Sequence, residues 1–211
     1  MRNYSTALLV TALIIVSGLQ ESTLGWAQQP SPMISVSLGA IEPLRGSTES
    51  AIYPEVEFSV PIYFHPNTGK TLSAALYAAY WSDGVTEFVS CGADCVAYAY
   101  RAGMLGLRLR QQLTANPVNF SIHLGLSQQF LRAKYVGGFG IVGNPGKDHS
   151  DIVRSVTSGV RVQLNLSQTL RFVGGGQIGM RLGDTNSGHK STQWMSRFGI
   201  AYQLGSRRKA R

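Results

Sequence analysis

Charged side chains recur at alternating positions in segments that otherwise hold mainly apolar or small residues, and these groups have the clearest capacity for chemistry. They are Glu55, Glu57, Arg108, Arg110, Arg161, Arg171, Arg181 and Arg197. Carboxylates and guanidinium groups that share a face can form ion pairs. An arginine without a carboxylate partner can instead hold an anion or water, or stack on a tyrosine ring such as Tyr63 or Tyr77. We therefore take these residues as the candidate functional site.

The histidines do not form a recognisable catalytic group. His123 lies on the polar face of its segment. His149, Ser150 and Asp151 have the residue types of a hydrolytic triad, but adjacent side chains of an extended chain point apart, and a triad is defined by its geometry in space. The glycine-rich stretch 136–140 lacks the flanking strand and helix of a phosphate-binding loop. We predict no catalytic residue, no bound metal and no cofactor.

The elements that position these groups are indicated by an alternation of apolar with polar or small residues, which begins near residue 33. Residues 118–127 show it most clearly, because Val, Phe, Ile, Leu and Leu alternate with Asn, Ser, His, Gly and Ser. Amphipathic helical periodicity is nowhere convincing. The alternation predicts eight β-strands, within residues 34–40, 55–64, 72–81, 103–110, 118–127, 156–164, 170–182 and 194–204.

The connections between these segments carry a second signal. Short connections, over 65–70, 111–117 and 165–168, alternate with long ones, over 42–51, 82–98, 128–151 and 183–192. Outer-membrane barrels have this layout, with short periplasmic turns and long external loops. Pro54 and Pro61 cannot donate a backbone hydrogen bond, so we expect each of them at a barrel rim or a bulge.

Three features favour a membrane barrel over a soluble one. The apolar faces match the roughly 9 to 11 residues that a tilted strand needs to cross hydrocarbon. The polar faces are rich in Gly, Ser and Ala, whereas soluble surfaces prefer Lys and Glu. Phe64, Tyr80, Trp194 and Tyr202 lie near the ends of apolar faces, where interfacial aromatic residues belong. In lipid the sheet must close on itself, so we predict an all-β fold, an eight-stranded antiparallel up-and-down transmembrane β-barrel.

The N-terminal residues predict export. Arg2 precedes the apolar run 7–16, and Gly25, Trp26 and Ala27 provide a cleavage site, so we expect a signal peptide over 1–27. The run is shorter than the roughly 20 residues of a spanning helix. The barrel would occupy 28–204, and residues 205–211 would form a basic periplasmic tail. A formal net charge of +8 does not indicate nucleic acid, because the basic residues are dispersed and an exported chain does not meet the genome.

These features together resemble the small outer-membrane barrels typified by OmpA and OmpX, over essentially all of residues 33–204. The resemblance rests on the signal peptide, the eight alternating segments, the loop asymmetry and the last strand, which contains Trp194, Phe198 and Tyr202. It implies a protein of the cell outer membrane of a Gram-negative-type bacterium, inserted by the barrel assembly machinery. Such chains commonly end on an aromatic residue, whereas here residues 203–211 follow Tyr202.

The barrel layout assigns positions to the candidate groups. Glu55, Glu57, Arg181 and Arg197 are expected in the outer half of the lumen, where opposite charges can pair. The other four arginines, 108, 110, 161 and 171, are expected nearer the periplasm, with too few counterions. Cys91 and Cys95 enclose three residues of an external loop, so we predict a disulfide, because an exported chain matures in an oxidising compartment. A zinc site would want about four ligands, and no other cysteine or histidine lies nearby in sequence.

Two functions remain open on the sequence alone, with a third of lesser weight. The first is a non-enzymatic surface protein, whose lumen is filled by polar side chains and whose external loops contact lipopolysaccharide or a ligand that the sequence does not name. The second is a lipid A-modifying enzyme of the deacylase or palmitoyltransferase kind. The deacylases use a histidine and a serine that face the membrane, whereas His123 is expected to face the lumen. The third is a soluble, lipocalin-like barrel with an apolar ligand cavity.

Overall fold

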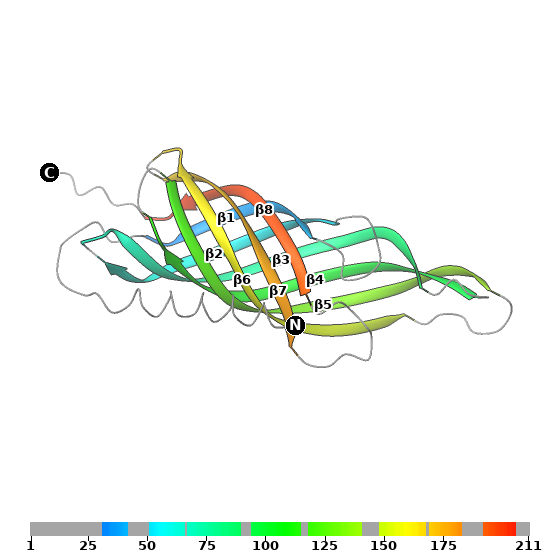
Figure 1. Cartoon of the computed structure of the whole chain (residues 1–211). Coiled ribbons are helices and arrows are strands. Elements are labelled where there is room, and N and C mark those ends of the chain that lie inside the picture. The colour runs from blue at the N-terminus through cyan, green and yellow to red at the C-terminus, as the bar shows by residue number, and fades with distance from the viewer. Residues whose placement is uncertain are drawn as a thin grey trace.

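The chain folds into one closed barrel. The computed structural model describes residues 31–41, 51–65, 67–89, 94–114, 118–140, 148–167, 169–182 and 192–205. The strands are β1 (Met33–Ile41), β2 (Ala51–His65), β3 (Lys70–Val89), β4 (Asp94–Gln112), β5 (Val118–Gly140), β6 (His149–Asn165), β7 (Leu170–Leu182) and β8 (Thr192–Gln203). Each strand pairs antiparallel with its neighbours in sequence, and β1 also pairs with β8 (Figure 1). The predicted fold class is confirmed.

Some predicted segments lie outside the described residues. These are the signal peptide over 1–27 and the basic tail apart from Gly205. No helix among the described residues is long and apolar enough to cross a membrane.

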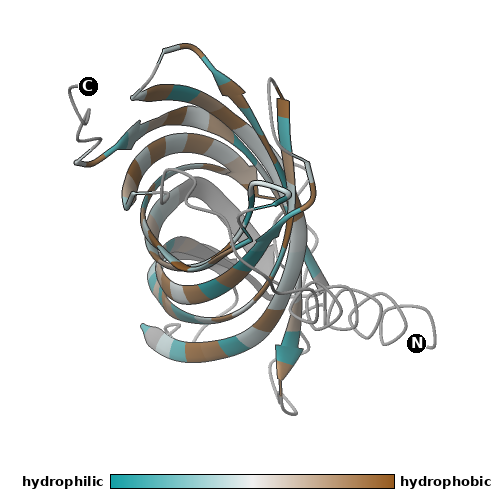
Figure 2. Cartoon of the chain, turned by 90° about the vertical axis from the view of Figure 1, so that its left-hand side faces the viewer, coloured by the Kyte–Doolittle hydropathy of each residue, from teal (hydrophilic) through white to brown (hydrophobic). Residues whose placement is uncertain are grey.

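The alternation in the sequence separates the two faces of the barrel wall. In β1, Ile34, Val36 and Leu38 are exposed on the outside, whereas Ser35 and Ser37 are buried inside. Figure 2 shows the same alternation of hydrophobic and hydrophilic residues along the other strands. A soluble protein buries its large apolar residues, so this barrel is inside out and its outer surface suits lipid. The arrangement argues against the lipocalin-like alternative, whose apolar face would line the bore.

One side of the barrel is taller than predicted. The strands β3, β4 and β5 contain 20, 19 and 23 residues, and their pairing continues as far as Asp94 opposite Gly140. The predicted loops over 82–98 and 128–151 are therefore wrong in extent, because most of their residues continue as paired strands. Valine, phenylalanine and tyrosine recur there, and these residues favour strands even beyond the apolar belt. The external ends of β3, β4 and β5 project past the rest of the barrel (Figure 1).

The two prolines of β2 lie in different surroundings. The register between β2 and β3 shifts between Pro61 and Tyr63, which marks a bulge, so Pro61 agrees with the expectation of a rim or bulge. Pro54 pairs with Leu38 inside the continuous ladder between β1 and β2, although pairing with β3 begins only at Glu55. The expectation of a rim or bulge therefore holds for Pro61 and not for Pro54.

Candidate functional site in the barrel lumen

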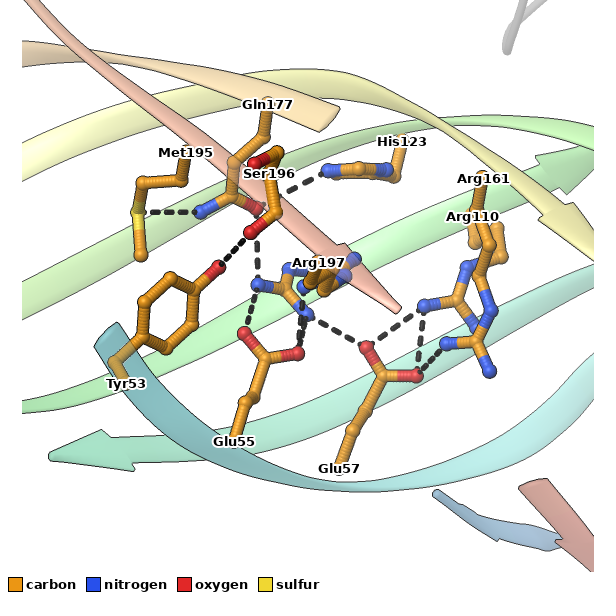
Figure 3. Close-up of polar contacts among 11 residues, drawn as sticks. Tyr53, Glu55, Glu57, Arg110, His123, Arg161, Gln177, Met195, Ser196 and Arg197 are labelled. Carbon is orange, nitrogen blue, oxygen red and sulfur yellow. Dashed lines mark hydrogen bonds and ion pairs between the residues drawn. The ribbon is translucent and has the colours of Figure 1, made fainter. Parts of the chain in front are cut away.

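Two glutamates of β2 occupy the centre of the bore and are surrounded by arginines of β4, β6 and β8 (Figure 3). Glu55 is 2% exposed. Its Oε1 and Oε2 accept hydrogen bonds from Nη1 and Nη2 of Arg108, both at 2.9 Å. Oε1 also accepts one from Nη1 of Arg197 at 2.6 Å. Glu55 thus joins β2 to β4 and β8 through charge-assisted bonds, the stronger class of hydrogen bond.

Glu57 binds three arginines. Its Oε2 accepts a bond of 2.7 Å from Nη1 of Arg108, and both of its oxygens accept bonds of 2.8 Å from Nη2 of Arg110. Nη1 of Arg161 donates to Oε1 as well. Because every partner is buried, the contacts are poorly screened by solvent, and Glu57 neutralises charge from two different strands, β4 and β6.

Arg108 connects the two glutamates. Its side chain is completely buried, Nη2 also donates to Gln177 Oε1 at 2.9 Å, and its guanidinium carbon lies 3.4 Å from the centre of the Tyr77 ring. Gly106 provides the space for that ring, because a Cβ atom at residue 106 would overlap Tyr77. Arg108 therefore combines ion pairs with a cation–π contact.

The structure groups the predicted charged residues differently from the sequence prediction. Arg108, Arg110 and Arg161 were expected near the periplasm with too few counterions, but they contact the glutamates. The prediction counted positions along each strand, whereas barrel strands are tilted and staggered, so residues from different positions reach one level. Arg171 lies apart from the two glutamates and donates to Gln203 Oε1 at 2.8 Å.

Arg181 also lies apart from the glutamates. Its Nη2 lies 3.3 Å from Oδ2 of Asp151. The sequence analysis missed Asp151 as a partner because it placed this residue in a loop. The continuation of β6 up to His149 brings Asp151 into the sheet, where it pairs near the external rim.

An apolar cluster fills the external end of the bore. It contains Ile41, Tyr53, Tyr77, Ala79, Trp81, Ala102, Met104 and Met195. Tyr53 and Trp81 meet edge to face with ring centres 6.4 Å apart, and the Tyr53 hydroxyl donates to the carbonyl oxygen of Ser196 at 3.2 Å. We call this group the external plug. The plug was not predicted from the sequence, because alternation shows which face of a strand a side chain is on but not which side chains of different strands meet.

The remaining candidates do not assemble into a reactive site among the residues that can be described. His123 is fully buried, and its Nε2 lies 3.4 Å from Gln177 Oε1 inside the lumen. Ser150 is exposed, while Asp151 pairs with Arg181. The side chain of His149 lies outside the described part, as do Cys91 and the side chain of Cys95. The predicted disulfide therefore stays a prediction.

Four exposed cations of β4, β5 and β6 lie on the outer surface near the external end. They are Arg101, Arg132, Lys134 and Arg154, and we call them the basic patch. Arg101 lies directly opposite Arg132 in the pairing of β4 with β5. Like charges placed in this way repel each other unless an anion neutralises them. They were not singled out from the sequence, because the predicted segments 103–110, 118–127 and 156–164 do not include them.

Comparisons with known proteins agree on the fold. No family model matches the sequence, and no curated protein matches it either. Neisserial surface protein A is similar in structure with a TM-score of 0.55 at 12% identity, over 82% of this chain and 96% of that one. A major outer membrane protein of Thermus thermophilus gives 0.54 at 15% identity, over 82% and 100%. The N-terminal barrel domain of Pseudomonas aeruginosa OprF gives 0.51 at 10% identity, over 82% and 98%.

Proposed function

We propose that this chain, which has the eight-stranded fold of small outer-membrane barrels, is a non-enzymatic anchor in the outer membrane with a closed bore and surface-exposed hairpins. The observation that carries the proposal is the filled lumen. The ion pairs of Glu55 and Glu57 with their four arginines form a charged network. The external plug and this network lie one above the other along the bore, and their largest side chains are almost completely buried. Eight strands enclose little more than their own side chains.

Solute release from vesicles tests the closed bore. Vesicles that contain the refolded barrel should release small sugars and ions no faster than protein-free vesicles, because the plug and the ion pairs occupy the path. A wide porin in the same lipid provides the positive control. Stable, stepwise single-channel currents from the pure barrel in a planar bilayer would contradict the proposal.

The outer surface supports a non-enzymatic role. A lipid-modifying barrel needs polar catalytic groups facing the membrane. The two histidines whose side chains can be described, His65 and His123, are buried, and the two glutamates of β2 face the lumen. Outward positions in the middle of the wall hold residues such as Leu107, Leu126 and Val160. We therefore favour an anchor over the deacylase or palmitoyltransferase alternative.

We further propose that the basic patch binds phosphate groups of lipopolysaccharide. The patch follows the apolar belt on the same outward face, so lipid headgroups are the anions nearest to it. Among the residues of known position, none of its four cations has a carboxylate within 4 Å. Cations at a membrane surface attract anionic lipid, and the attraction is screened by salt.

Co-purification of lipopolysaccharide tests the basic patch. Replacing Arg101 and Arg132 with glutamine should reduce the lipopolysaccharide retained per barrel severalfold at low salt, because two adjacent cations are removed. Lys70→Gln is the matched control, since Lys70 is an exposed cation at the opposite end of the barrel. Equal retention by the double variant and by Lys70→Gln would refute this contact.

A further inference from the structure

The charged network in the lumen carries an excess of positive charge. Glu55 and Glu57 contribute two negative charges, whereas Arg108, Arg110, Arg161 and Arg197 contribute four positive ones, which leaves a formal charge of +2. All six side chains are at most 7% exposed. Within the described ranges, no other carboxylate lies within 4 Å of these arginines. Buried charge without a counterion is costly, so the network has a physical need for an anion.

A cavity lies next to this network at the periplasmic end of the bore. It has a volume of about 50 Å³. Its polar lining includes Arg110, Arg171, Ser59, Ser73 and Ser121. Both charged residues in the lining are arginines, and they come from β4 and β7. The cavity therefore offers hydrogen-bond donors and positive charge, and the lining that can be described contains no carboxylate.

Arg110 supplies the second observation that points to a ligand. Its side chain is 4% exposed, and Nη2 donates to both oxygens of Glu57. Its Nε and Nη1 atoms have no hydrogen-bond partner among the residues that are described. A buried guanidinium with unsatisfied donors loses much of the hydrogen-bond energy that water would give it. These two atoms have almost no accessible surface, so the Arg110 side chain must turn toward the adjacent cavity before an acceptor there can recover that energy.

We propose that this cavity binds a small inorganic oxyanion of the phosphate or sulfate type. The ligand accepts hydrogen bonds from Arg110 and the surrounding hydroxyl groups, and it offsets the excess charge of the network. A water molecule needs roughly 10 to 15 Å³ of cavity space, so a cavity of about 50 Å³ admits a group of a few heavy atoms and excludes sugars, nucleotides and peptides. Because the external plug closes the opposite end, the anion enters from the periplasmic side. The inference does not depend on what the external hairpins bind.

The test is anion-dependent stability of the full-length barrel, refolded in uncharged detergent. Phosphate is titrated at constant ionic strength, with sodium chloride as the balancing salt, and unfolding is followed by tryptophan fluorescence. At a phosphate concentration ten times its dissociation constant, the unfolding equilibrium constant should fall about elevenfold. Stabilisation by sodium chloride alone to the same extent would overturn the proposal, because it would indicate general screening.

Arg171→Gln is the informative variant, because Arg171 lines the cavity but does not contact either glutamate. We expect this variant to fold and to need at least about tenfold more phosphate for the same stabilisation, which corresponds to the loss of one charge-assisted bond. Lys70→Gln, which removes an exposed cation that lines neither the cavity nor the basic patch, should behave like the unsubstituted protein. An identical phosphate response in Arg171→Gln and the unsubstituted protein would overturn the proposal, as would a direct calorimetric titration without saturable binding.

Discussion

Replacing Glu57 with glutamine is expected to lower the free energy of unfolding by about 3 to 5 kcal/mol, the range found when one partner of a buried ion pair is removed. Glu57 is 2% exposed and contacts Arg108, Arg110 and Arg161. Glutamine has nearly the same shape, so packing is preserved while three buried guanidinium groups lose a shared counterion. Urea-induced unfolding in detergent micelles measures the effect.

Asp151→Asn is the matched control for this prediction. Asp151 is 39% exposed in its side chain and pairs with Arg181 at 3.3 Å, so the loss of its charge should cost about 0 to 1 kcal/mol. Removing one arginine together with Glu57 should restore part of the charge balance in the bore. The double variant Glu57→Gln with Arg110→Gln is therefore expected to lose less unfolding free energy than the two single changes lose in sum. Equal destabilisation by Glu57→Gln and Asp151→Asn would show that the network does not stabilise the barrel.

Replacing Gly106 with valine should destabilise the barrel by about 1 to 3 kcal/mol, the usual cost of overpacking a tight interior. A Cβ atom at residue 106 would overlap the Tyr77 ring, so the ring has to leave its position over Arg108. Gly103→Val provides the control on the same strand, because a Cβ atom there meets nothing within 4 Å. The temperature at which the compact form is lost on an unboiled gel measures both variants.

A second substitution distinguishes overpacking from other causes. Tyr77→Ala removes the ring that obstructs the new side chain, so Gly106→Val combined with Tyr77→Ala should destabilise the barrel by less than the sum of the two single changes. The coupling is read from a double-mutant cycle. Purely additive effects, or equal destabilisation by Gly103→Val, would be inconsistent with the close approach of Gly106 and Tyr77.

The sequence predicted the number of strands and the two faces of the wall because side chains in a strand point alternately to opposite sides. Strict alternation in β5 places Ser121 and His123 inside and Leu126 outside, as observed. The upper parts of β3, β4 and β5 were missed because alternation weakens above the lipid belt, although β-favouring residues continue. Strand ends were therefore less predictable from the sequence than strand faces.

The partners of the charged residues were less predictable than their face. All the predicted lumen residues lie on inward positions of their strands, but Glu57 contacts Arg161, 104 positions away in sequence. Such contacts depend on the stagger between strands and on long side chains, and alternation within one strand reports neither. The external plug was not predicted for the same reason, because Trp81 of β3 and Met104 of β4 were placed on the lumen face but alternation does not report that they pack together.

Cell fractionation combined with gel mobility tests whether the chain forms a closed barrel in the outer membrane. The protein is expressed in a bacterium with two membranes, and the fractions are compared with and without boiling on a denaturing gel. We expect recovery in the outer-membrane fraction and a compact form whose mobility changes on boiling, because the closed hydrogen-bonded sheet resists detergent at low temperature. Recovery as a protein that stays in solution without detergent, with one mobility before and after boiling, would contradict this expectation.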